Sequence, residues 1–381
     1  MLKVSERGLI SPFIVMDVMR AANERAVAGE DVLHLEVGQP STSAPRRVLD
    51  AAKRALDTQV LGYTDALGIP PLREKIAGFY QTRYGISIDP GRVIATTGSS
   101  GGFLLAFLSA FDVGDKVGLA SPSYPAYKNI ITALGLHAVD IPVGPSSHFQ
   151  PTTQLLEPYA SELDGLVVAS PSNPTGSMID SGGMKALASW CHRNDIRLIS
   201  DEIYHGITYG DPAETALTHA QNVIVVNSFS KYFSMTGWRL GWMVVPENML
   251  RSIECLAQNL FISPPSLSQN AVLEVFDCFD ELDENVARYA VNRDLLLTEL
   301  PRAGIDSLAP SDGAFYIYAD VSHLTDDSTE FCRRLLAETG VAVTPGADFD
   351  NARGQSFIRV CYAGGTDDIS VAALRLKEWL P

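Results

Sequence analysis

The sequence has few cysteines and no apolar run long enough to cross a bilayer. Its five cysteines, in 381 residues, are scattered and include no Cys-x-x-Cys pair. They read as reduced thiols rather than a disulfide framework or a zinc site, and we expect no metal. The segment from Met1 to Phe13 has no apolar core, so we predict no signal peptide, no membrane partner and a cytoplasmic location.

Basic residues are outnumbered by acidic ones. Lysine and arginine total 29 against 45 aspartates and glutamates, a net charge of −16. This excess disfavours nucleic acid and acidic membranes as partners. The 46% hydrophobic and 19% charged residues are typical of a packed globular protein. Because the length exceeds the usual size of one core, we expect two domains, or one large α/β domain with a smaller addition.

The usual nucleotide-binding loops are also missing. The Gly/Ser-rich turn Thr96 to Gly102 has no lysine after its glycines and no Gly-x-Gly-x-x-Gly spacing, which disfavours nucleotides. It lies between a predicted strand and a predicted helix, where backbone N–H groups and hydroxyls suit a phosphate. A tight structural turn is the alternative.

Predicted strands alternate with predicted helices over most of the chain. The strands are 93–97, 117–120, 166–170, 196–200, 223–227 and 240–245, with helices such as 102–111 and 181–193. This pattern predicts a mostly parallel, helix-covered sheet, with ligands at the carboxyl ends of its strands. After Asp283 the pattern becomes α+β: a long polar helix, strands at 314–319 and 357–361, and helices at 330–339 and 368–380. We expect a large domain over 40–283 and a small domain over 1–39 and 284–381.

Lys231 follows the predicted strand 223–227, in a Ser-rich loop that also contains Arg239. Burial at such a position lowers the pKa of a lysine and favours the neutral amine that forms an imine. A surface lysine in a Ser-rich loop is the alternative. Two more polar groups follow strands: Asn173 in a proline-flanked turn and Asp201 after an apolar strand. An Asx turn and a helix N-cap are their structural alternatives.

Three motifs occur in order: Ser172-Asn173-Pro174-Thr175-Gly176 after Pro171, Asp201-Glu202-Ile203-Tyr204, and the Lys231 loop. In this order they resemble the fold-type I pyridoxal-phosphate enzymes, specifically the class I/II, aspartate aminotransferase-like family. The resemblance extends from Glu36 to Val360. It implies a three-layer α/β sandwich with a mostly parallel seven-stranded sheet, a smaller α+β domain, and pyridoxal 5′-phosphate as cofactor.

The resemblance also implies roles for individual residues. Lys231 would form the Schiff base and move the substrate proton, Asp201 would pair with the pyridine nitrogen, and Asn173 and Tyr204 would bond the ring 3′-oxygen. Tyr124 would stack on the ring; a core or surface aromatic beside a Pro-rich turn is its alternative. The phosphate would be held by Ser99, Ser100, Gly101, Ser228 and Arg239, with Ser230 adjoining the lysine.

Substrate and subunit contacts follow from the same resemblance. Arg359 would clamp the substrate α-carboxylate, helped by Gly38 and Asn173, although periodicity alone favours an exposed strand residue at position 359. Tyr63 would reach the phosphate of the neighbouring subunit, and the segment 263–266 would line the partner's site, which implies a homodimer with shared active sites. One departure is Asp350, which stands where the family's Pro-Gly-x-x-Phe element is usually followed by glycine.

The expected function is transfer of an amino group between an L-amino acid and a 2-oxo acid, by a ping-pong cycle through pyridoxamine phosphate. No second arginine is assignable to an ω-carboxylate, and Phe13, Ile14, Tyr63 and Tyr124 suit apolar or aromatic side chains. A carbon–sulfur β-lyase or another elimination enzyme would use the same Lys231, Asp201 and Arg359. A cofactor-sensing regulator is disfavoured by the acidic charge and by the lack of a preceding DNA-binding segment.

Overall fold

A seven-stranded sheet forms the centre of the larger part of the molecule. The computed structural model describes residues 2–380. The strands are β2 Val93–Thr96, β3 Lys116–Ser121, β4 His137–Pro142, β5 Gly165–Ala169, β6 Arg197–Asp201, β7 Ile224–Ser228 and β8 Gly241–Val244. Their order is β2-β8-β7-β6-β5-β3-β4, and every pairing is parallel except those of β8. The expected mostly parallel sheet is therefore confirmed.

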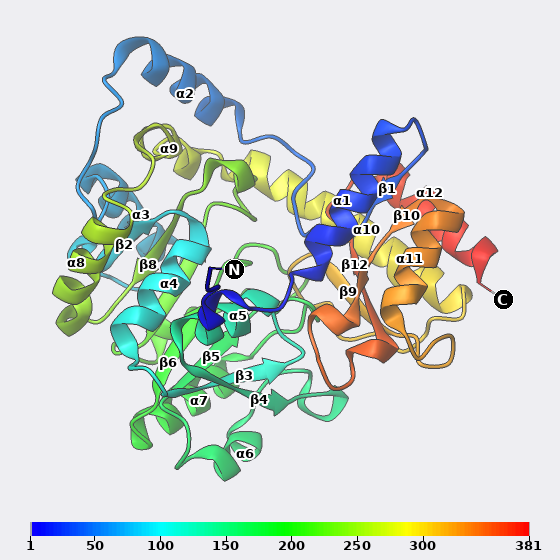
Figure 1. Cartoon of the computed structure of the whole chain (residues 1–381). Helices are drawn as coiled ribbons and strands as arrows, with labels where there is room; N and C mark the ends of the chain where they lie inside the picture. Colours follow the sequence, from blue (N-terminus) through cyan, green and yellow to red (C-terminus); the bar gives the residue numbers. More distant parts are fainter. Residues whose placement is uncertain (1, 381) are drawn as a thin grey trace.

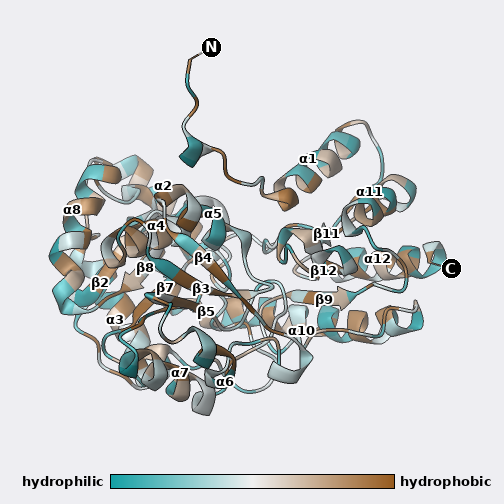
Figure 2. Ribbon diagram, turned by 60° about the horizontal axis from the view of Figure 1, so that its bottom comes forward, coloured by the Kyte–Doolittle hydropathy of each residue, from teal (hydrophilic) through white to brown (hydrophobic). Residues whose placement is uncertain are grey.

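Helices cover both faces of this sheet (Figure 1). They include α3 Pro70–Tyr84, α4 Gly98–Ala110, α5 Pro125–Leu134, α6 Thr153–Leu156, α7 Ser181–Arg193, α8 Leu250–Leu260 and α9 Ser266–Val272. Helix α2 Arg46–Thr58 lies farther from the sheet and packs against α9. Alternate residues of each buried strand pack against opposite layers. In β5, Val167 belongs to the apolar cluster that also contains residues of α4, α5 and α8, whereas Leu166 and Val168 belong to the cluster that contains residues of α3 and α7. Figure 2 shows these apolar strands between the helices.

The smaller part of the molecule contains two short sheets. Strands β9 Tyr316–Asp320, β12 Phe357–Cys361 and β11 Thr344–Pro345 form an antiparallel sheet with β12 in the middle. Strand β1 Leu33–His34 pairs with β10 Val341–Ala342. Around them lie α1 Ile14–Val27, α10 Phe279–Arg302, α11 Ser328–Thr339 and α12 Thr366–Trp379. The pairing of β1 with β10 brings the amino-terminal segment to the carboxyl-terminal elements (Figure 1).

Helix α10 joins the two parts of the molecule. It runs unbroken from Phe279 to Arg302, so the boundary expected at 283/284 falls inside a helix. The domain bounds stay a prediction. None of the helices within residues 2–380 is long and apolar enough to cross a bilayer. Over the same range, no three His, Cys, Asp or Glu side chains gather as a metal site, and the five cysteines are free thiols.

Candidate active site

The predicted site residues follow strands whose carboxyl ends lie at one edge of the large sheet. Tyr124 follows β3, Asn173 follows β5, Asp201 ends β6, and Lys231 follows β7. Since β8 runs opposite to both neighbours, β2 points the same way as β7, and the turn before α4 reaches the same edge. The topology thus brings residues from distant parts of the sequence to one place.

Lys231 is half-buried beside aromatic rings. Its Nζ lies 5.8 Å from the ring centre of Tyr204 and 5.9 Å from that of Phe315, and it donates a hydrogen bond to the backbone oxygen of Gly38. Burial lowers the pKa of Lys231 to about 8, and the positive charges of Arg359 and Arg239 act in the same direction. A neutral amine is therefore accessible at Lys231 near physiological pH. This environment differs from that of a surface lysine.

Asp201 ends β6 with its carboxylate buried. The carboxylate accepts hydrogen bonds from the Tyr127 hydroxyl and from the backbone N–H of Ile203, the latter at 3.1 Å. The Ile203 bond is an Asx turn, and no helix begins at Asp201, which removes the N-cap alternative. Burial raises the pKa of Asp201 to about 6, although both hydrogen bonds and the charge of Lys231 act to lower it.

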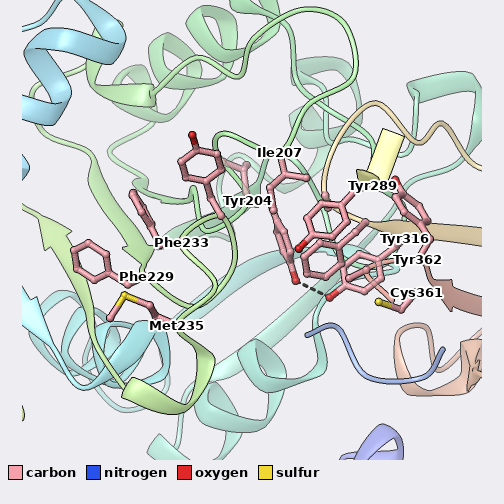
Figure 3. Close-up of a cluster of buried hydrophobic side chains, with 14 of the residues drawn as sticks. Tyr204, Ile207, Phe229, Phe233, Met235, Tyr289, Tyr316, Cys361 and Tyr362 are labelled. Atoms are coloured by element: carbon pink, nitrogen blue, oxygen red, sulfur yellow. Dashed lines mark hydrogen bonds between the residues drawn. The ribbon is translucent and has the colours of Figure 1, made fainter. Parts of the chain in front are cut away.

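Tyr204 and Tyr316 connect the two parts of the molecule at the site. Their hydroxyls lie 2.7 Å apart, and both rings are buried in the aromatic cluster of Figure 3. Tyr316, on β9, also lies where a side chain on Gly38 would have to be, so only glycine fits at position 38. The backbone oxygen of Gly38 thereby remains within reach of Lys231.

Arg359 lies in the middle of β12 and is only 2% exposed, so the surface position that periodicity favours is wrong. Its Nη1 donates to Asn173 Oδ1 at 2.8 Å, and its Nη2 donates to the backbone oxygen of Glu36 and, at 3.1 Å, to Thr344 Oγ1. Its Cζ lies 4.4 Å from the ring centre of Tyr316. Within residues 2–380, Arg359 Nε is buried without a partner. The guanidinium is thus rigidly held and keeps donor capacity.

The start of α4 and the Lys231 loop form a cradle between them. Gly98 has a φ of +76°, and a Cβ there would stand 2.5 Å from Arg239 Nη2, so the guanidinium lies directly against the turn. Arg239, itself at a φ of +51°, is exposed and donates through Nη1 to the backbone oxygen of Thr236 at 2.9 Å. Across the loop, the Ser228 hydroxyl lies 2.8 Å from that of Ser230.

The predicted residues on α4 differ in exposure. Ser99 is half-buried, Ser100 is exposed and Gly101 is buried against Thr97. Together with Arg239 they give a helix amino terminus that is open to solvent beside a permanent positive charge, which is a suitable environment for a phosphate.

Tyr63 does not lie in the site of its own chain. Its side chain is 83% exposed, on the connection between α2 and α3. The next residue, Thr64, donates its backbone N–H to Ser263 Oγ at 3.3 Å. The two segments that the resemblance assigns to a partner's site, at 63 and at 263–266, are therefore neighbours.

Sequence reasoning missed two side chains of the site, Tyr127 and Tyr316. Tyr127 lies one helical turn after Tyr124, on the same side of α5, and this spacing is the signal that pointed to it. For Tyr316 the only signal was its place in the predicted strand 314–319, because its partners come from distant segments. A surface hollow of about 1280 Å³, lined by residues such as His148, Asp180 and Asp312, contains none of the predicted site residues.

Comparison with known proteins agrees with this arrangement. Residues 30–375 match the family model for aminotransferase class I and II. The chain is 54% identical to the valine–pyruvate aminotransferase of Mycobacterium tuberculosis, covering 100% of this chain and 99% of that protein. It is 35% identical to the (5-formylfuran-3-yl)methyl phosphate transaminase of Methanocaldococcus jannaschii, covering 97% and 96%.

Solved structures match over the full fold. A crystal structure of an aminotransferase from Mycobacterium tuberculosis superposes with a TM-score of 0.98 at 54% identity, covering 100% of both chains. Aspartate aminotransferase from Thermus thermophilus with maleate gives a TM-score of 0.93 at 30% identity, covering 99% of this chain and 100% of that chain. The chain therefore belongs to the aminotransferase class I and II family and is an aminotransferase.

Proposed function

We propose that this chain binds pyridoxal 5′-phosphate and transfers the amino group of an apolar L-amino acid, with L-valine as the first candidate, to pyruvate. The observation that carries the cofactor proposal is the half-buried Lys231, which bonds the backbone oxygen of Gly38 at the carboxyl edge of the sheet where the buried Asp201 also lies. The choice of L-valine and pyruvate rests on the 54%-identical valine–pyruvate aminotransferase. The apolar contact of Phe13 with Tyr124, ring centres 5.7 Å apart, supports it.

The residues present fit this cofactor. The cradle of Ser99, Ser100, Gly101, Ser228, Ser230 and Arg239 offers hydroxyls, N–H groups and a guanidinium to the phosphate. Tyr124, Asn173, Asp201 and Tyr204 surround the place of the ring. When bound, pyridoxal phosphate supplies an electron sink for the pair left behind by the substrate Cα proton.

The chain's own residues would then divide the remaining work. Arg359 binds the substrate carboxylate through its fixed fork, with Asn173 orienting the guanidinium. The backbone of Gly38 lines the same position. Lys231 Nζ, as a neutral amine, would accept the proton from the substrate Cα. In the second half-reaction it would return a proton to the same carbon of the new amino acid. Asp201 supplies the negative charge that keeps a pyridine nitrogen protonated, and Tyr127 holds its carboxylate in place.

We further propose a cytoplasmic homodimer in which Tyr63 of the partner subunit completes the phosphate site. The exposure of Tyr63, together with the exposed apolar side chains of Leu56, Val60 and Ile262, supports an interface at this surface. Free thiols fit a reducing compartment.

The test uses the purified protein loaded with pyridoxal phosphate and no 2-oxo acid. L-valine should shift the absorbance of the bound cofactor and yield one equivalent of its 2-oxo acid, and pyruvate should restore the spectrum and form L-alanine. L-aspartate, which carries a second carboxylate, should react more weakly. The elimination alternative needs a separate substrate with a leaving group on Cβ, such as S-methyl-L-cysteine. Ammonia, pyruvate and the thiol accumulating from it over many turnovers, without an added 2-oxo acid, would indicate an elimination enzyme instead.

A further inference from the structure

The segment 346–353 between β11 and β12 contacts three separate parts of the site. It begins next to Thr344, which lies opposite Arg359 in the β11–β12 pairing. Its Phe349 ring centre lies 4.7 Å from the guanidinium carbon of Arg359. The segment therefore supports the arginine that we expect to bind substrate carboxylate.

The same segment also holds the start of helix α1. The two carboxylate oxygens of Asp348 accept from the backbone N–H groups of Ile14, at 2.9 Å, and Val15, at 3.1 Å. A carboxylate at a helix amino terminus is stabilising there. Phe13 precedes this helix and packs against the ring of Tyr124.

On its other side the segment is bonded to the large sheet. The backbone oxygen of Phe349 accepts from Ser123 N–H at 3.1 Å, and Arg353 Nη2 donates to the backbone oxygen of Ser121. Ser121 ends β3, and Tyr124 follows three residues later. These two bonds fix the connection that carries Tyr124 to the segment that supports Arg359.

Asp350 aims Arg353 at this connection. Asp350 is buried, and its Oδ1 accepts from the N–H groups of Ala352, at 2.9 Å, and Arg353, at 3.1 Å. Its Oδ2 accepts from Arg353 Nε at 2.9 Å and lies 2.8 Å from Nη2. Although burial acts to raise the pKa of Asp350, these hydrogen bonds lower it, so the carboxylate is charged at neutral pH. A glycine at position 350 makes none of these bonds.

We propose that Asp350 and Arg353 form a positioning pair of this active site. The pair holds the segment 346–353 against the β3–α5 connection, so that the guanidinium of Arg359 and the ring of Tyr124 keep a fixed separation. Neither residue touches the reacting atoms. The proposal rests on the proposed function, since Arg359 and Tyr124 act as described only if the site binds amino and 2-oxo acids on pyridoxal phosphate.

Loosening the pair should affect substrate binding rather than the chemical step. A displaced Arg359 loses contacts that the substrate makes in both the ground state and the transition state, which raises KM and leaves kcat unchanged. Because both half-reactions use the same carboxylate site, the KM values for the amino acid and for the 2-oxo acid should rise by the same factor.

The experiment compares Asp350→Asn, Arg353→Gln and Arg353→Lys with wild-type holoenzyme, using L-valine and pyruvate. The matched control is Glu330→Gln, which breaks the exposed Glu330–Arg333 pair on α11. Asp350→Asn and Arg353→Gln should each raise both KM values about tenfold, with kcat within about twofold of wild type. Arg353→Lys, which keeps one donor, should recover part of this loss.

Several outcomes overturn the proposal. If the variants unfold at a lower temperature than wild type but keep both KM values, the pair contributes to stability alone and does not position the site. KM values equal to those of Glu330→Gln, or a rise for only one substrate, contradict a shared positioning role. An inactive wild type overturns the proposed function and this pair with it, whereas an active wild type with unaffected variants overturns the pair alone. Because the Arg353 side chain is half-exposed, its variants provide the answer if Asp350→Asn does not fold.

Discussion

Asp201 is buried and Lys231 is half-buried, and the loss of contact with water shifts the pKa of each side chain toward its neutral form. Neither shift is compensated by a close ion pair, because Lys231 donates to a backbone oxygen and Asp201 accepts from a hydroxyl and an amide. Ionisable side chains that are withdrawn from water without an ion-pair partner reduce the stability of the folded state, and they are typical of reactive sites.

Replacing Asp201 by Asn should remove most turnover and little of the fold. Asn keeps the shape, and its Oδ1 can still accept from the Ile203 N–H while its NH2 group donates to the Tyr127 oxygen, but it lacks the charge that holds a pyridine nitrogen protonated. We expect kcat to fall by about a hundredfold or more, with the unfolding midpoint near that of wild type. Tyr127→Phe, which removes one donor to Asp201, should give a milder loss of about tenfold. A folded Asp201→Asn enzyme with wild-type turnover would remove Asp201 from the mechanism.

The stability of the cofactor-free protein should depend on pH through Asp201. The pKa of Asp201 rises from 3.8 to about 6 on folding, so the folded state holds this proton after the unfolded chain has released it. Wild type therefore loses stability relative to Asp201→Asn as pH rises from about 4 to about 6, by about 3 kcal/mol in total. Denaturant unfolding of both proteins across this range measures the difference, which should then stay constant up to pH 7. If wild type instead gains stability relative to Asp201→Asn as pH rises from about 4 to about 6, the result would contradict the burial of this carboxylate.

The same linkage has the opposite sign for Lys231. Its pKa falls from 10.5 to about 8 on folding, so the unfolded chain binds the proton more strongly. Relative to Lys231→Met, the cofactor-free wild type should therefore gain stability as pH rises from about 8 to about 10.5. Paired unfolding curves at each pH check this trend, and a flat difference would mean that the amine stays in contact with water.

The sequence predicted those helices and strands whose apolar residues have a regular local spacing. The apolar runs of β5, β6 and β7 and the helix α7 were found because buried strands and amphipathic helices have characteristic spacing. Strand β4 was missed as an element: it lies at the edge of the sheet, is mostly unburied and alternates polar with apolar residues. The burial of Arg359 opposes periodicity, since β12 is the middle strand of a small sheet with both faces covered.

The residues of the candidate site also divide into those with a local sequence signal and those placed by long-range contacts. The places of Lys231, Asp201 and Asn173 at or just after the ends of strands were predictable, because each lies in a recognisable motif after an apolar run. Tyr127, which bonds Asp201, had only the indirect signal of its spacing from Tyr124. Tyr316 and the Arg353–Ser121 bond were not predictable, because the partners lie 112 and 232 positions apart. Long-range packing of this kind leaves no local signal.

The turn before α4 provides a test at this scale. Gly98→Ala adds a Cβ at a positive φ and against Arg239, so it should displace the guanidinium and destabilise the protein by about 1–2 kcal/mol. Affinity for pyridoxal phosphate should fall as well. The control is Gly78→Ala on the exposed side of α3, where nothing lies within 4 Å and alanine should be neutral or stabilising. Thermal unfolding and cofactor titration measure both effects; unchanged cofactor affinity in Gly98→Ala would place the phosphate elsewhere.

The whole molecule combines a strongly negative net charge with a positive site. The chain carries −16, yet Lys231, Arg239 and Arg359 converge where anionic groups are expected. Positive charge is therefore local, which suits small anions and disfavours polyanions. Arg239 and Tyr63 are both exposed in the single chain. In the proposed dimer, we expect the partner subunit to cover both side chains.

If the active sites are shared between two subunits, as proposed, two inactive variants should complement each other in a hybrid dimer. Tyr63→Ala and Lys231→Ala should each be inactive or nearly so, because each removes one component from every site. If the two variants are unfolded and refolded together, half of the dimers are hybrids, and each hybrid contains one site with both Lys231 and Tyr63. About one quarter of wild-type activity should return. Separately refolded variants mixed at the end provide the control and should stay inactive. If the mixture recovers nothing beyond this control while light scattering shows a dimer, Tyr63 serves its own subunit or none.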